Sequence, residues 1–138
     1  MAHQLELRIS SDPRWCRTVR AMMQEIARQA GFSDMERHDI SLAIDEALAN
    51  VIKHSYKGDP NGPVSLTCAA ADGWLEVVLR DQGEGFDPKK ADHLAPDELR
   101  VGGRGVFLMR ATMDEVEFGR AGETNTVRLR KYLKAQDR

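Results

Sequence analysis

The chain has 138 residues, and at about 100 to 200 residues per domain this length predicts one domain spanning 1–138. Hydrophobic residues make up 41% and charged residues 30%, a balance that excludes a disordered chain and a membrane-embedded one. Lys and Arg number 20 and Asp and Glu 22, so the net charge of -2 gives no general attraction to nucleic acid or to a membrane, and neither is expected as a partner.

The two cysteines and the N-terminus indicate the compartment. Cys16 and Cys68 lie in separate predicted elements without CxxC or Cys/His spacing, which argues against a disulfide framework and a zinc site. The segment 1–9 alternates in polarity and contains no long apolar run, which argues against a signal peptide and a membrane anchor. We therefore expect reduced thiols in a cytoplasmic protein.

Hydrophobic periodicity predicts a strand and two helices in the N-terminal half. The run 5–9 alternates in polarity, which favours a half-buried strand. Apolar residues recur at helical spacing over 13–30, which predicts the first helix. Ser33 and Glu36 have the spacing of a capping box, which predicts a second helix that runs to about Tyr56.

The C-terminal half is predicted to contain two strand pairs and one short helix. Two alternating runs on either side of Asp72-Gly73 indicate a hairpin. A polar stretch reaches to about Val101, and a short helix is predicted over 106–113. The runs 115–119 and 126–133 then predict a closing antiparallel pair. This order of elements predicts an α+β two-layer sandwich, with the helices on one face of the sheet.

The glycines are concentrated in two clusters. Five of the 11 fall between Gly83 and Gly105. The second cluster leads into a helix, whose N–H groups and positive dipole end could cradle phosphates. A lone glycine cluster is more often a tight turn, and this alternative stays open on the cluster alone. The Walker GxxxxGK[ST] motif and a strand-linked GxGxxG are absent from the sequence, so any nucleotide must bind in another way.

The second helix carries a polar stripe. Glu46, Asn50 and His54 are spaced at i, i+4 and i+8 and so share one side of the helix. One interpretation of this stripe is a solvated face. Asn50 favours a functional interpretation, because asparagine is a mediocre helix former in mid-helix. His54, near the helix end, is expected to be structural rather than catalytic.

These residues resemble a known family. The segment 45–56 resembles the N-box of the GHKL ATPase superfamily, in the version found in anti-sigma factor serine kinases. The segment 81–86 is similar to the first glycine box, 103–109 to the second, and 125–129 to the last box. Four motifs in the right order over nearly the whole chain make the resemblance specific. It implies the Bergerat fold of histidine-kinase-like ATPases, a sandwich with a mixed, mostly antiparallel sheet.

The resemblance implies an ATP site that uses Mg²⁺. Asn50 would hold the Mg²⁺ ion, and Glu46 would accept the proton of an attacking hydroxyl. Asp81 would accept a hydrogen bond from the adenine amino group, with Thr126 supporting the adenine beside it. The other residues expected to contact the nucleotide are Gly83, Gly85, Gly103, Arg104 and Gly105.

Two positions depart from the family pattern. The best-known members carry an arginine, thought to contact the terminal phosphate, where this chain has Val101. Arg100 and Arg104 are the candidates to replace it. Asn125 stands where glycine is common in the last box. The polar segment 87–101 is expected to be a lid that orders when nucleotide binds.

The function implied by the resemblance is ATP-dependent serine/threonine kinase activity. The kinase would phosphorylate a small STAS-domain antagonist and regulate a sigma factor by partner switching. An alternative is a regulatory module that holds ATP without transferring phosphate: Glu46 favours the kinase and Val101 the module. A histidine-kinase catalytic domain is disfavoured because no phosphoacceptor-histidine hairpin precedes the N-box, and a ligand-free structural domain because of Asn50 and Asp81. The resemblance leaves a homodimer open.

Overall fold

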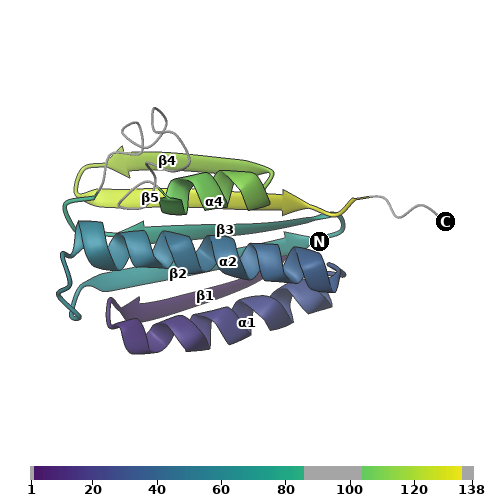
Figure 1. Cartoon of the computed structure of the whole chain (residues 1–138), viewed down its shortest axis with the longest axis horizontal. Coiled ribbons are helices and arrows are strands. Elements are labelled where there is room, and N and C mark those ends of the chain that lie inside the picture. Colours follow the sequence, from purple (N-terminus) through teal and green to yellow (C-terminus); the bar gives the residue numbers. More distant parts are fainter. Residues whose placement is uncertain (1, 86–103, 135–138) are drawn as a thin grey trace.

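The computed structural model describes residues 2–85 and 104–134, which form a layer of helices on a sheet (Figure 1). The first half contains β1 (His3–Ser10), the 3-10 turn η1 (Pro13–Trp15), α1 (Cys16–Gln29), α2 (Asp34–Asn50) and the π-helical turn η2 (Val51–Ser55). The second half contains β2 (Pro63–Ala71), β3 (Trp74–Asp81), α4 (Arg104–Thr112), β4 (Glu115–Ala121) and β5 (Thr124–Tyr132).

The strands form one sheet in the order β1-β2-β3-β5-β4, and every pairing between the described strands is antiparallel. In Figure 1, α1, α2 and α4 all lie in front of the same face of this sheet. The predicted α+β two-layer sandwich is therefore confirmed. The sheet was expected to be mixed, but β2–β3 and β4–β5 are hairpins and β5 pairs with β3, which makes the described part antiparallel throughout.

Local sequence signals explain several element boundaries. Ser33 and Glu36 form the predicted capping box at the start of α2, with Glu36 N–H donating to Ser33 Oγ at 3.2 Å. Gly73 takes φ +89° in the turn between β2 and β3, a conformation that glycine adopts without a steric penalty. The predicted hairpin follows directly from this turn.

The second helix was expected to run to about Tyr56, and its helical path does continue to Ser55. Its last turn, η2, is π-helical from Val51, which the sequence did not predict. The Tyr56 N–H donates to the Val51 carbonyl at 3.0 Å, which is the wide spacing of a π-helix. Such turns are rare and occur most often at functional sites, and this one ends beside the candidate site described below.

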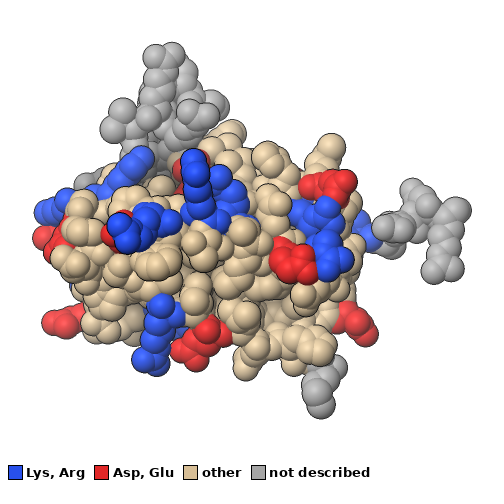
Figure 2. All heavy atoms as spheres, turned by 90° about the horizontal axis from the view of Figure 1, so that it is seen from below, with Lys and Arg blue, Asp and Glu red and all other residues tan. Residues whose placement is uncertain are grey.

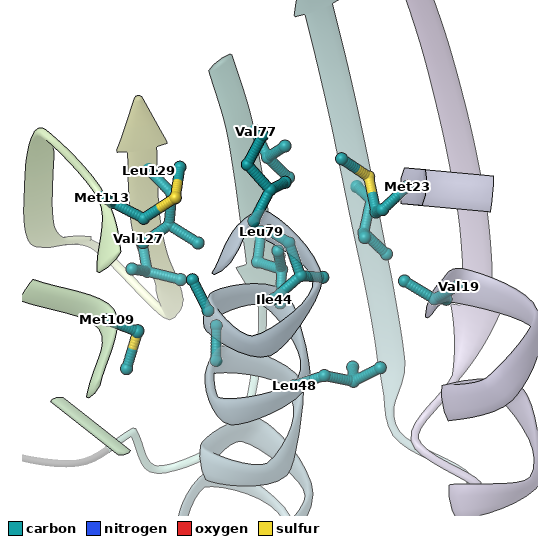
Figure 3. Packing of buried hydrophobic residues seen from close by; sticks show 14 of the residues in the cluster. Val19, Met23, Ile44, Leu48, Val77, Leu79, Met109, Met113, Val127 and Leu129 are labelled. Carbon is teal, nitrogen blue, oxygen red and sulfur yellow. The ribbon is translucent and has the colours of Figure 1, made fainter. Parts of the chain in front are cut away.

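The hydrophobic core lies between the helices and the inner face of the sheet. In Figure 3, Ile44 of α2 and Met109 of α4 lie on the side of the labelled β3 and β5 side chains, whereas Met23 of α1 lies beside β2. The largest fully buried side chains include Met23, Ile44, Leu48, Leu79, Met109 and Leu129. Burying one such side chain stabilises the fold by about 1.5 to 3 kcal/mol, so packing fixes α2 and α4 against the sheet.

Both cysteines are free thiols. Cys68 is buried on β2 with its Sγ 3.5 Å from Met23 Sδ, and burial raises the pKa of its thiol to about 11. Burial also raises the pKa of the Cys16 thiol, and the nearby Asp45 carboxylate raises it further. Both thiols are therefore protonated at neutral pH, which makes them poor nucleophiles.

The sheet face opposite the helices carries charged side chains. Arg128 on β5 lies 2.9 to 3.0 Å from the carboxylates of Glu76, Glu115 and Glu117. On another side of the molecule, Figure 2 shows acidic and basic side chains intermixed rather than separated by sign. Over residues 2–85 and 104–134, no helix combines the length and apolar character needed to cross a membrane.

Candidate active site

A cavity of about 650 Å³ opens where α2, α4, the end of β3 and the β4–β5 hairpin meet. Its volume is that of a site for a small-molecule ligand. The residues that line it are Ala47, Asn50, Val51, Ser55, Asp81, Glu84, Gly85, Met109, Phe118, Gly119, Arg120, Asn125, Thr126 and Val127. The predicted N-box, first glycine box and last box therefore all contribute to one cavity.

Glu46 and Asn50 lie one turn apart on α2 and both approach Gly105, in the first turn of α4. A Cβ atom on Gly105 would stand 3.0 Å from Glu46 Oε2 and 3.3 Å from Asn50 Oδ1. A larger residue at this point would crowd both polar groups and force them to shift. The N–H groups and dipole of the α4 N-terminus lie at the same place and favour an anion there.

The carboxamide of Asn50 has an unsatisfied atom. Its Nδ2 is buried and has no hydrogen-bond partner among the described residues. A buried polar atom without a partner costs free energy unless a ligand forms a hydrogen bond with it. Rotation of the amide by a half-turn would place its oxygen, rather than its nitrogen, at this position. Over residues 2–85 and 104–134, no three His, Cys, Asp or Glu side chains gather into a metal site. The donor set fits Mg²⁺, which takes few protein ligands and shares phosphate oxygens.

Asp81 lines the same cavity from the end of β3 and is only 5% exposed. Its Oδ1 accepts hydrogen bonds from Gly83 N–H at 3.0 Å and from Asn125 Nδ2 at 2.9 Å. An ionised carboxylate offers only acceptors. Asp81 is therefore suited to bind an amino group, such as the one that adenine presents.

Gly83 and Gly85 are required by contacts within the protein. A Cβ atom on Gly83 would lie 2.2 Å from the Ser55 carbonyl oxygen in η2, which also accepts a hydrogen bond from Glu84 N–H at 2.9 Å. Gly85 takes φ +78°, and a Cβ atom there would lie 2.6 Å from Asn125 Oδ1. These glycines were predicted to let the backbone approach the nucleotide. Within the described residues, Gly83 allows a close contact with Ser55 and Gly85 a close contact with Asn125.

Tyr56, directly after η2, connects the end of this helical segment to the first glycine box. Its hydroxyl donates to the Pro63 carbonyl at 2.6 Å and accepts from Gln82 N–H at 2.8 Å. Burial raises the pKa of this hydroxyl, so it keeps its proton and the donor role. No local sequence pattern predicts this role, because Gln82 lies 26 positions from Tyr56 in the chain.

The comparisons with known proteins agree with this geometry. The histidine kinase-like ATPase domain family matches residues 9–131. The serine-protein kinase RsbW of Bacillus subtilis (strain 168) is 32% identical over 143 residues, which cover 98% of this chain and 89% of RsbW. The chain belongs to the histidine kinase-like ATPases, in the group of RsbW serine-protein kinases. The resemblance to anti-sigma serine kinases and the predicted enzyme class are thereby confirmed, and the family uses ATP.

Two solved structures have the same fold as this family member. The first contains the RsbU and RsbW domains of a Mycobacterium tuberculosis protein and matches with a TM-score of 0.68 at 21% identity, covering 94% of this chain and 31% of that one. The second is the SiaB–SiaC complex of Pseudomonas aeruginosa, with a TM-score of 0.64 at 13% identity and coverage of 94% and 89%. Both support the Bergerat sandwich.

Within this kinase fold, the register of the last box shows which of its residues contacts Asp81. Asp81 pairs with Asn125 across β3 and β5, whereas Thr126 pairs with Arg80. Thr126 lines the cavity, but the hydrogen bond to Asp81 comes from Asn125. Successive residues of a strand face opposite sides of the sheet, and residues paired across two strands face the same side. The side chain of Asn125, which is paired with Asp81, is therefore placed to form a hydrogen bond with it. Asn125 thus supports Asp81, and the predicted support of adenine by Thr126, which lines the cavity, stays a prediction.

Several predicted positions lie outside the described residues. These are Gly103, Arg100, Val101 and the segment 87–101 that was expected to form a lid. Arg104 begins α4, but its side chain also lies outside the described part. His54 lies in η2, is half-buried, and is not among the residues that line the cavity. The roles predicted for the second glycine box before Gly105 stay predictions.

Proposed function

We propose that this kinase transfers the terminal phosphate of ATP to a serine hydroxyl of a small STAS-domain antagonist. The observation that carries the proposal is the meeting of Glu46, Asn50 and Gly105 at the start of α4, beside the cavity that Asn50 and Asp81 both line. A nucleotide with its adenine at Asp81 would present its phosphates to the α4 N-terminus, which favours anions.

The proposed reaction is a direct displacement. The Glu46 carboxylate takes the proton of the serine hydroxyl as the serine oxygen bonds to the terminal phosphorus. The bond between that phosphorus and the bridging oxygen breaks, and ADP leaves with its electron pair. Asn50 would hold Mg²⁺, which when bound neutralises charge on the phosphates.

Partner switching follows from the charge of the product. Phosphorylation adds roughly -1.5 to -2 charge to the serine, next to the Glu46 carboxylate and the nucleotide phosphates. The product antagonist would be repelled, and the kinase would be free to bind a sigma factor. The RsbW relatives support this proposal through their activity, and the SiaB–SiaC neighbour is itself a complex of two proteins. A homodimer is compatible with the proposal and is not required by it.

The test is phosphate transfer to a defined acceptor. STAS-domain proteins that co-purify with the kinase from its native host are mixed with γ-labelled ATP and Mg²⁺. We expect acid-stable label on the antagonist, and none on a variant whose acceptor serine is alanine. Acid-labile label, which indicates phosphohistidine, would contradict the serine kinase.

A second candidate is a module that holds ATP and sequesters partners without transfer. The sequence observation that favours it is Val101, which replaces the arginine expected near the terminal phosphate. Tight ATP binding with no transfer to any antagonist that the protein captures would establish this alternative and exclude the kinase.

A further inference from the structure

Arg120 links the β4–β5 hairpin to the first glycine box at the adenine side of the cavity. It stands opposite Asn125 in the β4–β5 register and lines the cavity. Its Nη1 donates to Asn125 Oδ1 at 2.7 Å and to the Glu84 carbonyl at 2.8 Å, and its Nε donates to the Gly122 carbonyl at 3.2 Å. One guanidinium therefore holds a hairpin and a ligand-binding loop together.

Asn125 is held in one orientation by its neighbours. Its Nδ2 donates to Asp81 Oδ1 and to the Gly83 carbonyl, each at 2.9 Å, while its Oδ1 accepts from Arg120. A carboxamide has one donor end and one acceptor end, and a guanidinium only donates. Rotating the amide would set its oxygen against a carboxylate and a carbonyl and its NH₂ against Arg120. Arg120 thereby keeps a donor pointed at Asp81.

We propose that Arg120 is a positioning residue for adenine recognition, acting through Asn125 on Asp81. The inference rests on the proposed ATP site and adds a determinant of base specificity to it. Both described hydrogen bonds to the Asp81 carboxylate end on Oδ1, so they hold the carboxylate in one rotation. Oδ2 is then the oxygen that can accept a hydrogen bond from the base. Adenine presents an amino group there and guanine presents a carbonyl oxygen, which a fixed carboxylate repels.

Loss of Arg120 should weaken base discrimination more than it weakens the fold. Without it, Asn125 loses the partner of its Oδ1, and Asp81 can turn away from the position that rejects guanine. We expect Arg120→Ala and Asn125→Ala each to lower the ratio of ATP to GTP affinity by about tenfold, the value of one charge-assisted hydrogen bond. Arg120→Lys should recover part of the ratio, because lysine keeps the charge but not the fork of donors.

The experiment is calorimetric titration of each variant with Mg-ATP and with Mg-GTP. The ratio of the two affinities is the readout, because partial unfolding lowers both affinities equally. The double variant Arg120→Ala/Asn125→Ala should resemble Asn125→Ala alone, since residues that act in series are not additive. Arg8→Ala is the matched control, because Arg8 lies on β1 with a side chain 85% exposed.

The outcomes separate this inference from the proposed function. A wild-type chain that does not bind Mg-ATP would overturn both. If the wild-type chain prefers ATP and Arg120→Ala keeps the wild-type ratio, the positioning role is wrong while the ATP site stands. Effects of the two substitutions that add fully in the double variant would also overturn the role, because Arg120 would then act independently of Asn125.

Discussion

The two sides of the cavity are prepared for a ligand in different ways. At the adenine side, Asp81 and Asn125 are already held by hydrogen bonds from Gly83 and Arg120. At the phosphate side, the buried Nδ2 of Asn50 has no partner among the described residues. The recognition end is thus preorganised, which lowers the cost of binding, whereas the reactive end leaves polar groups to be completed by the substrate.

Phosphate transfer should be lost when a single side chain is added at Gly105. Gly105→Val should lower phosphate transfer by more than about a thousandfold, because a Cβ there displaces Glu46 and Asn50 from the reacting groups. Transfer from γ-labelled ATP measures this effect. Ala111→Val is the control, since Ala111 is exposed on the same helix. Transfer at the wild-type rate in Gly105→Val would show that Gly105 does not border the reaction.

Base recognition at the adenine side should be lost when the acceptor Asp81 is changed. Asp81→Asn should weaken ATP binding by about a hundredfold, because an amide NH₂ would face the Gly83 and Asn125 donors or the adenine amino group. Calorimetry with Mg-ATP measures the change. Asp72→Asn is the matched control in the exposed β2–β3 turn. An Asp81→Asn variant that binds ATP normally would remove Asp81 from base recognition.

The hydrogen bonds of Tyr56 to the first glycine box and to Pro63 should have a smaller effect. Tyr56→Phe removes the hydroxyl that joins Gln82 N–H to the Pro63 carbonyl, at a cost of about 1 to 2 kcal/mol in the free energy of unfolding. ATP affinity should fall with it, because the first glycine box loses an anchor. Urea unfolding and calorimetry test both points. Tyr132→Phe, at an exposed position at the end of β5, should leave ATP affinity unchanged. Equal loss in both variants would argue against a specific link.

The outer face of the sheet should matter least. Arg128→Ala removes ion pairs with Glu76, Glu115 and Glu117, which solvent screens, so we expect only a small loss of stability. Because these residues face away from the helices, ATP affinity should not change. Thermal unfolding should show a small shift that shrinks at high salt. A loss of ATP binding in this variant would mean that the two faces are coupled.

Sequence reasoning succeeded where the signal is local. The capping box of Ser33, the turn at Gly73 and the spacing of Glu46 with Asn50 each depend on residues close in the chain, and the fold family follows from motifs in order. The role of Asn125 was missed because it depends on which residue of β5 pairs with Asp81, a register that a shift of one residue inverts.

The remaining features depend on contacts between distant segments. The hydroxyl of Tyr56 bonds to Gln82 across 26 positions, and Arg120 reaches Glu84 across 36. The π-helical turn η2 likewise ends where the Ser55 carbonyl accepts from Glu84 N–H. These contacts form only when distant segments pack together, so no periodicity or local motif in the sequence predicts them.

The most direct test of the account is whether binding and transfer separate at Glu46. Calorimetry with Mg-ATP and transfer of labelled phosphate to the captured antagonist are measured for wild type, Glu46→Gln and the control Asp39→Asn on the same helix. The account predicts that Glu46→Gln binds ATP within about twofold of wild type and loses transfer by at least about a hundredfold, because only the proton acceptor is removed. Transfer at the wild-type rate in Glu46→Gln would contradict it.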